Sequence, residues 1–266
     1  NPFQPGKEIK QVLPSEVNAN IEHLKTLLQT AVEEKAFPGG VLLAAKDGKI
    51  FFHEAFGFHT YGKKRETRKS DIFDLASISK VVATTSAIMK MYDDKLIDLD
   101  DKVVSYLPQF KGRQKKYFNH KSNITIKHLL THSSGLPPFR KYFLMDKDIK
   151  LVLDSLYNTE PIYGLEEKTV YSDVGIITLG KIVEKVSLKG LDTYVEENIT
   201  SPLGMHTTFF NPPKEKINRI VPTEIDQNNN LIKGYVHDEN AFKLGGVAGH
   251  AGLFSTTNDL ATFSQM

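Results

Sequence analysis

Two apolar segments separated by Lys46-Asp47-Gly48 are the sequence feature that most limits how this chain folds. Residues 41–45 and 50–53 consist mainly of apolar residues, several of which favour strands. An Asp-Gly pair between two such segments is typical of a tight β-hairpin turn. Before them, apolar residues recur with helical spacing at Ile21, Leu24, Leu27, Leu28 and Val32. The N-terminal part therefore predicts a helix followed by an antiparallel strand pair.

The following 160 or so positions are mostly helical in pattern. Apolar residues dominate from Ser77 to about Tyr92 and again from Val174 to Val186, and residues 194–203 continue in the same way. A short helix through Leu129-Leu130 ends before a Gly and Pro pair of stop signals. Residues 211–240 are predicted to form loops. Thr257 or Asn258 can cap a last helix. This order predicts an α/β (α+β) fold, in which helices flank an antiparallel sheet and form a large helical insertion.

The division of the chain follows from the same patterns. Residues 1–16 carry three prolines and mixed polar residues, which predicts a linker or extended lead-in. Residues 17–266 are predicted to form a single domain, with 17–75 and about 240–266 in its sheet part. Residues 76–239 make up its mainly helical part. The chain begins at Asn1, which indicates a processed form or an excised piece.

Composition excludes several classes of protein. The 266 residues are 40% hydrophobic and 25% charged, as in ordinary globular proteins. A net charge of +2 argues against a nucleic-acid binder, and a solvated loop explains the basic run from Lys111 to Lys121 better than a binding patch does. The absence of cysteine excludes disulfides, thiolate catalysis and cysteine-ligated metals. No apolar run is long enough to span a membrane.

Ser77-Ile78-Ser79-Lys80 is the motif with chemical meaning. It is the one place in the chain where a lysine follows a serine by three positions. On a helix these two positions share a face, so the hydroxyl and the amine can meet. A serine becomes a nucleophile when a neighbouring base accepts its proton. Alone the motif is weak, because a capping serine with an exposed lysine gives the same letters.

Other segments agree with this motif in order and spacing. The chain resembles the serine β-lactamase and penicillin-binding protein superfamily, in its class C-like and penicillin-binding protein 4B-like (esterase-like) branch. The resemblance covers about residues 20–266 and rests on six segments: SISK at 77–80, LLTHSSGLP at 129–137, YSDVG at 171–175, PLGM at 202–205, VHDEN at 236–240, and GHAGLFST at 249–256. It implies a β-lactamase/transpeptidase-like fold, no cofactor and no metal.

The superfamily's second motif is Tyr-x-Asn, and three places offer Tyr-x-Asn or Tyr-x-Asp. Tyr92 is too near Lys80 to fold back, and Tyr117 lies in the lysine-rich segment. Tyr171 directly precedes a predicted helix and follows the serine at a long interval, as in the family. The resemblance therefore implies Ser77, Lys80 and Tyr171 as catalytic residues. Asp173 stands where the family has asparagine, and a carboxylate near Lys80 favours the charged amine, leaving more of the base role to Tyr171.

The third motif of the family is Lys-Thr-Gly or His-x-Gly, and it supplies a second oxyanion-hole donor. His250-Ala251-Gly252 fits the letters, but it runs directly into segments that precede this motif in the family. We therefore expect the third motif, the last strands and the C-terminal helix to lie outside this chain. His250 is expected either to face the cleft, as a substrate-binding residue with Asp173, or to be structural. His237-Asp238-Glu239 is better explained as a loop than as a metal cluster, and no His-Glu-x-x-His pair occurs.

The resemblance implies a serine hydrolase that forms an acyl-enzyme on a small-molecule or peptidoglycan-peptide substrate, in the manner of a D,D-peptidase or β-lactamase. A small-ester carboxylesterase is the nearest alternative, because one fold can host several acyl transfers. A non-catalytic penicillin-recognising module is the alternative from another class. The family also implies a periplasmic or other extracytoplasmic location. Related domains are found fused to a glycosidase, so fusion to another catalytic domain in the native polypeptide is compatible with the resemblance.

Overall fold

A computed structural model describes residues 9–17, 21–112, 114, 118–145 and 148–266. The chain divides into two compact units. The first contains residues 1–74, 200–234 and 254–266, and the second contains residues 75–199 and 235–253. Both combine segments that are distant in the sequence. Residues 200–234, which we predicted in the helical part, belong to the unit that contains the sheet.

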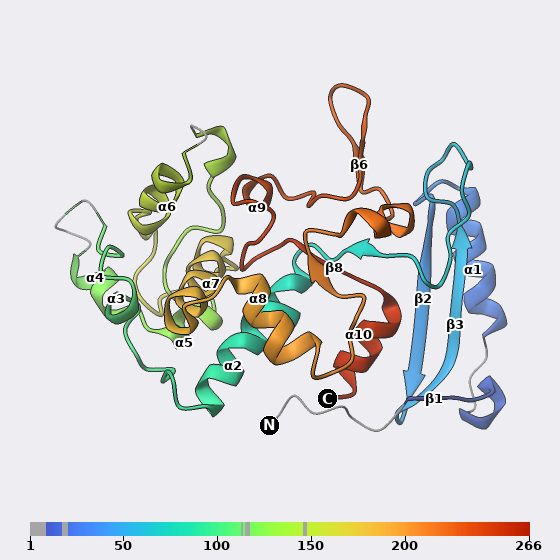
Figure 1. Ribbon diagram of the computed structural model, residues 1–266, viewed down its shortest axis with the longest axis horizontal. Helices are drawn as coiled ribbons and strands as arrows, with labels where there is room; N and C mark the ends of the chain where they lie inside the picture. Colours follow the sequence, from blue (N-terminus) through green and yellow to red (C-terminus); the bar gives the residue numbers. More distant parts are fainter. Residues whose placement is uncertain (1–8, 18–20, 113, 115–117, 146–147) are drawn as a thin grey trace. The chain divides into compact units, whose positions relative to one another are not determined.

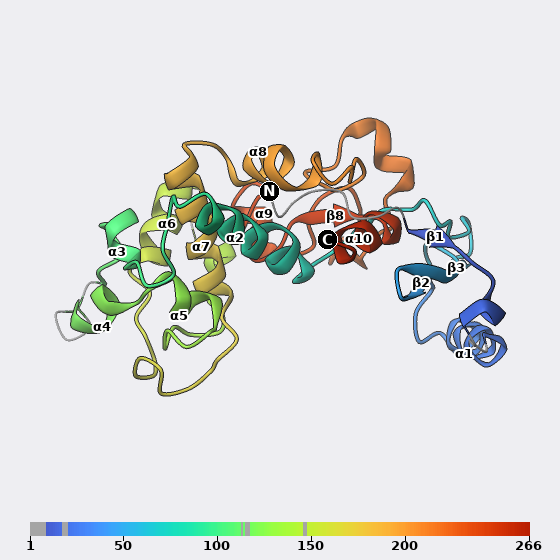
Figure 2. The same ribbon diagram turned by 90° about the horizontal axis from the view of Figure 1, so that it is seen from below.

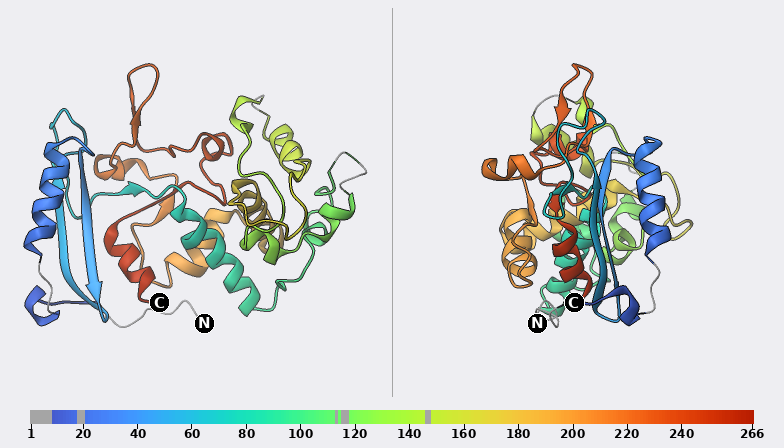
Figure 3. Two further views of the ribbon diagram at one scale, coloured as in Figure 1. Left: turned by 180° about the vertical axis from the view of Figure 1, so that it is seen from behind. Right: turned by 90° about the vertical axis from the view of Figure 1, so that its right-hand side faces the viewer.

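The first unit contains the predicted hairpin, which is confirmed. Strands β2 (Gly39–Lys46) and β3 (Lys49–Gly57) pair antiparallel around Asp47 and Gly48, both of which have positive φ. Two consecutive positive φ values are what a type I′ hairpin turn requires. Helix α1 (Glu22–Glu33) contacts β3 and helix α10 (Thr257–Ser264) contacts β2. Figure 3 shows these two helices on opposite faces of the sheet.

Part of the predicted lead-in is ordered structure. Strand β1 (Lys10–Gln11) pairs parallel with β3, and a 3₁₀ turn follows at Pro14–Val17. The sheet order is β1-β3-β2. A second small sheet has the order β4-β8-β5 and a third pairs β6 with β7; the strands are β4 (Phe73–Asp74), β5 (Phe209–Phe210), β6 (Glu224–Ile225), β7 (Leu231–Ile232) and β8 (Leu253–Ser255). A 3₁₀ turn at Lys214–Arg219 precedes β6.

The second unit is helical and is built around α7 (Asp173–Ser187). Nine of its residues are buried, among them Val174, Ile177 and Leu179. Such burial along its length makes α7 the centre of the core. Its neighbours include the π-helical turn η2 (Lys80–Thr85), α2 (Ser86–Asp93), α3 (Val103–Tyr106), α5 (Ile126–Leu130), α6 (Ile149–Tyr157) and α8 (Leu191–Val195). The five helices among them are labelled in Figures 1 and 2. The remaining helical pieces are α4 (Phe118–Asn123), η4 (Tyr142–Leu144), η5 (Glu196–Thr200) and α9 (Glu239–Lys243).

Three local predictions differ from the structure. The basic run expected as a solvated loop ends in α4, where Lys121 is fully buried because two main-chain carbonyls accept its ammonium hydrogens. The cap of α10 is Thr256, one position earlier than expected, because its hydroxyl accepts from the Asp259 amide. Asp238 is the cap of α9 and not part of a plain loop.

In the part of the chain that the structure describes, no helix has the length and apolar character needed to cross a bilayer. The predicted fold class, a mixed α/β architecture with a large helical part, is confirmed.

Candidate active site

Ser77 lies in a tight turn between β4 and η2, inside the second unit. The turn is closed by hydrogen bonds from the amides of Ile78, Ser79 and Lys80 to carbonyls three residues earlier. Ala76, which precedes the serine, has a φ of +44°, a region that disfavours any residue with a Cβ. The Ser77 amide donates no hydrogen bond within the described ranges. It is therefore available to a ligand.

Lys80 is buried beside this serine, with 4% of its surface exposed. Its Nζ donates to Ser77 Oγ at 2.8 Å and to the main-chain carbonyl of His250 at 3.0 Å. Asp173 Oδ1 lies 2.8 Å from the same nitrogen. That oxygen accepts no hydrogen bond from the described residues, so the contact is an ion pair without hydrogen-bond geometry. A buried ammonium needs such partners to offset the loss of water.

Tyr171 covers the remaining side of this amine. Its ring centroid lies 4.9 Å from Lys80 Nζ, and 53% of the residue is exposed. Its exposed hydroxyl makes no hydrogen bond to the described residues. Of the competing tyrosines, Tyr92 lies on α2 and is half exposed, and Tyr117 lies outside the described residues. The structure thus brings Tyr171 and Asp173 to the Ser77–Lys80 pair.

The start of α7 fixes Tyr171 and Asp173 in place. Ser172 caps the helix, since its Oγ accepts from the Gly175 amide and donates to the Pro137 carbonyl at 2.7 Å. The Asp173 amide donates to the Pro138 carbonyl at 2.8 Å. A carboxylate in the first turn is also favoured by the helix dipole. The segment at 129–137 therefore supports the start of α7 and, with it, Tyr171.

His132 belongs to this support, although we had not singled it out from the sequence. Its ring lies 4.7 Å from that of Tyr171, and its Nδ1 accepts a hydrogen bond from the Ser172 amide at 3.1 Å. Burial lowers the pKa of His132, and the positive charge of Lys80 lowers it further against the opposing charge of Asp173. The ring is therefore neutral at neutral pH, with its proton on Nε2. Its place in the LLTHSSGLP segment was the available signal.

His250 meets Lys80 through its main chain and not through its ring. The ring is buried, with 1% of the residue exposed, and its Nε2 lies 2.8 Å from Asp238 Oδ1. Burial alone raises the pKa of Asp238, but the hydrogen bond and charge of His250, the Ala241 amide and Lys80 together lower it below the ordinary value. Asp238 is therefore a carboxylate at neutral pH.

The segment that carries His250 lies against both η2 and α7. Thr84 donates to the Gly249 carbonyl at 2.6 Å, and Ser79 accepts from the Leu253 amide at 3.1 Å. Gly249 permits this approach, because a Cβ there would lie 2.3 Å from the Ile176 carbonyl oxygen. Only a glycine fits so close to the backbone of α7.

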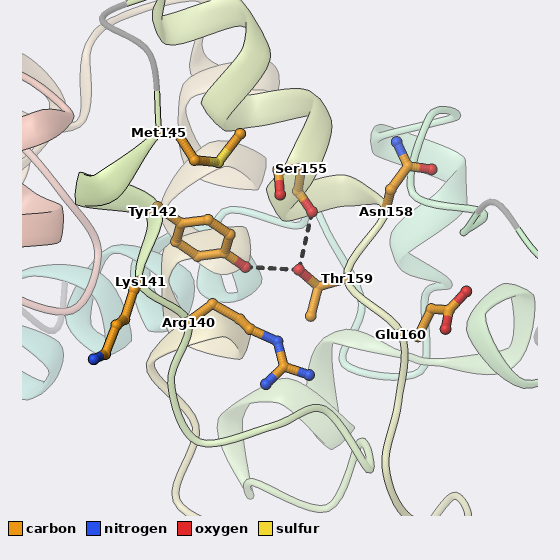
Figure 4. Close-up of a pocket in the computed structure, with 8 residues that line it drawn as sticks. All are labelled: Arg140, Lys141, Tyr142, Met145, Ser155, Asn158, Thr159 and Glu160. Carbon is orange, nitrogen blue, oxygen red and sulfur yellow. Dashed lines mark hydrogen bonds between the residues drawn. The ribbon is translucent and has the colours of Figure 1, made fainter.

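A separate hollow of about 370 Å³ lies in the same unit (Figure 4). It is lined by Arg140, Lys141, Tyr142, Met145, Ser155, Asn158, Thr159 and Glu160. Its buried hydroxyls bond to protein groups: the Tyr142 and Thr159 oxygens are 2.7 Å apart, and Thr159 donates to the Ser155 carbonyl at 2.9 Å. It contains none of the residues around Lys80. No group of three or more potential metal ligands occurs in the residues that the structure covers.

The sequence of this chain matches known proteins. The family model described as Beta-lactamase matches residues 24–266. The chain is 33% identical, over an alignment of 310 residues, to an N-acetylmuramyl-L-alanine amidase of Bacillus subtilis (strain 168), with 99% of this chain and 69% of that protein covered. It is 32% identical over 286 residues to an Escherichia coli (strain K12) protein named "Putative D-alanyl-D-alanine carboxypeptidase", with 95% of this chain and 65% of that protein covered.

A solved class C β-lactamase is similar in fold, with a TM-score of 0.74, 20% identity, and 94% of this chain and 64% of that one covered. The chain spans about two thirds of the length of the two relatives above, 69% and 65%. The family match extends over most of the chain and includes every residue around Lys80. This chain therefore belongs to the β-lactamase family of serine hydrolases.

Proposed function

We propose that this chain cleaves an amide bond in a peptidoglycan peptide, as a D,D-peptidase does, through an acyl-enzyme on Ser77. The observation that carries the proposal is the 2.8 Å contact between Lys80 Nζ and Ser77 Oγ. A serine within hydrogen-bond reach of a basic side chain is the signature of nucleophilic catalysis. The names of the amidase and carboxypeptidase relatives favour cell-wall amide bonds as substrates, and they support a proposed site of action outside the cytoplasm.

In the proposed first step, Ser77 Oγ bonds to the carbonyl carbon of the substrate. Its proton passes to Tyr171 or Lys80 and then to the leaving amine as the C–N bond breaks. A water molecule hydrolyses the resulting ester, which releases the acid and restores Ser77. The free Ser77 amide supplies a hydrogen bond to the developing oxyanion, a contact worth roughly 10²–10³-fold in rate in known enzymes.

In this proposal, Asp173 determines how proton transfer is divided between Lys80 and Tyr171. Its carboxylate stabilises the ammonium form of Lys80, which donates to Ser77 and so takes the smaller share as base. Tyr171 therefore takes the larger share as base. Asp173 is partly exposed and borders the substrate, whereas His250 contributes its carbonyl.

The test is covalent labelling of purified protein by a fluorescent penicillin and by a fluorophosphonate, followed by intact-mass analysis. We expect one adduct on wild type and none on Ser77→Ala. Ser105→Ala, an exposed serine on α3, is the matched control and should be labelled normally. Equal labelling of Ser77→Ala would refute the proposal.

Turnover separates the candidate substrates. Release of D-alanine from a peptide ending in D-Ala-D-Ala supports the D,D-peptidase. Hydrolysis of a small aryl ester without D-alanine release identifies a carboxylesterase instead. Reversible penicillin binding without any adduct identifies a binding module.

A further inference from the structure

Asp238 and the buried ring of His250 form a hydrogen-bonded pair in the second unit that the proposed reaction does not use directly. Asp238 Oδ1 and His250 Nε2 are 2.8 Å apart. The carboxylate side chain is 29% exposed and the ring 1%. Burying the polar ring is costly unless a partner satisfies it, so the pair calls for an explanation beyond surface charge.

The Asp238–His250 pair is connected to the Lys80 amine through the main chain of residue 250. The peptide carbonyl of His250 itself accepts from Lys80 Nζ at 3.0 Å. The neighbouring Gly249 carbonyl accepts from Thr84, one helical turn after Lys80. Rotating the peptide of residue 250 would therefore break a direct contact to the amine. That amine's other hydrogen bond is to Ser77.

The ring of His250 depends on Asp238 for its orientation. Its other nitrogen, Nδ1, is buried and has no hydrogen-bond partner among the described residues. The contact to the carboxylate oxygen requires a proton on Nε2, because a carboxylate only accepts. Asp238 thus determines the direction of the ring.

Asp238 is itself firmly anchored. Its Oδ1 also accepts from the Ala241 amide at 2.8 Å and so caps α9. On the same helix, Asn240 donates to the Arg140 carbonyl and accepts from the Phe143 amide. Because the Asp238 carboxylate is held in place by α9, it can in turn hold the ring and main chain of His250 in place.

We propose that the Asp238–His250 pair is a positioning device: it holds the His250 carbonyl against Lys80 and thereby aims the Lys80 amine at Ser77. The proposal rests on the proposed function, because it concerns the amine of the same nucleophile. Small misplacements of such a group cost about 10²-fold in rate.

Rates of Ser77 labelling by a fluorophosphonate test the proposal in two matched series. His250→Ala removes the donor to Asp238, whereas His250→Gln keeps an N–H at nearly the same place. Asp238→Ala removes the acceptor and the cap, whereas Asp238→Asn keeps both. We expect each alanine variant to be slowed about 10- to 100-fold, and each amide variant to recover most of that loss.

Asp148→Ala is the control for loss of a cap alone. Asp148 caps α6 and lies outside the contacts around Lys80, so its variant should be labelled at the wild-type rate. A folded His250→Ala that is labelled at the wild-type rate would overturn the proposal. So would a His250→Gln as slow as His250→Ala, since a merely space-filling role predicts no rescue by a donor.

A crystal structure of His250→Ala gives a readout that is independent of activity. We expect the carbonyl of residue 250 to turn away from Lys80 Nζ, beyond hydrogen-bond distance. An unmoved carbonyl would refute the positioning role even if labelling were slow. If Ser77 proves not to be the nucleophile, the proposed function fails, and this structure still decides whether the pair positions the carbonyl.

Discussion

Asp173 Oδ1 lies 2.8 Å from Lys80 Nζ, so the amine that contacts Ser77 is also ion-paired to a carboxylate at the start of α7. The family's usual asparagine would present a neutral amide there. The Asp173 carboxylate therefore stabilises the positive charge of the amine, which a neutral amide would not do.

Asp173→Asn is expected to speed labelling of Ser77 at neutral pH. The carboxylate lies 2.8 Å from Lys80 Nζ and stabilises the ammonium, which donates to Ser77, whereas a neutral amide gives no such charge stabilisation. Rates of fluorophosphonate labelling between pH 5 and 9 measure this. Asp192→Asn, on α8, is the control. Slower labelling at every pH would contradict the assigned role.

Tyr171→Phe should slow labelling by roughly 10²–10⁴-fold, the usual contribution of a positioned acid–base group. Stability should hardly change, because the lost hydroxyl makes no hydrogen bond to the residues that the structure describes. Labelling kinetics and thermal unfolding together check both points. Tyr92→Phe, on the competing Tyr-x-Asp segment, should behave as wild type in both assays. A fully active Tyr171→Phe would shift the base role to Lys80.

Ala76→Gly should stabilise the protein by roughly 0.5 kcal/mol. The positive φ of Ala76 costs a residue with a Cβ about 1–2 kcal/mol, and the added freedom of glycine in the unfolded chain offsets about 0.4–1 kcal/mol of the gain. Urea unfolding measures the difference. Ala31→Gly, inside α1, should instead destabilise by about 1 kcal/mol. Equal losses in both variants would show that Ala76 is not strained.

Lys121 should make stability depend on pH. Its buried ammonium donates to the Tyr157 and Thr159 carbonyls at 2.7 and 2.8 Å and lies 4.0 Å from the Phe110 ring centroid. Burial lowers its pKa to about 7, against the opposing charge of Glu160. Unfolded lysine has a pKa of about 10.4. Between these values the unfolded state binds more protons, so the free energy of unfolding rises with pH, by up to about 1.4 kcal/mol per unit.

Urea unfolding at pH 7, 8 and 9 checks this expectation. The wild-type free energy of unfolding should rise relative to that of Lys121→Met over this range. Lys127→Met, an exposed lysine on α5, should follow the wild type. Parallel curves for wild type and Lys121→Met would show that Lys121 keeps an ordinary pKa.

Local features were predictable because neighbours along the chain decide them. The hairpin at Asp47-Gly48 depends on two residues that accept positive φ, and the Ser77–Lys80 contact depends on one helical turn. Errors arose where side chains compete for a role: Thr256 caps α10 although Thr257 and Asn258 offered similar groups. The sequence predicted Lys121 in a solvated loop, because a run of basic residues does not show which main-chain carbonyls accept the hydrogens of this amine.

The sequence by itself determined the mixed α/β fold, the family, the pairing of Ser77 with an amine one turn away and, through the resemblance, a carboxylate near that amine. Only the tertiary structure placed the His250 carbonyl on that amine, and the Asp238 carboxylate on the buried ring of His250. These groups come from segments far apart in the chain. No local periodicity encodes such contacts, because the packing of α7 and of residues 249–253 against η2 creates them.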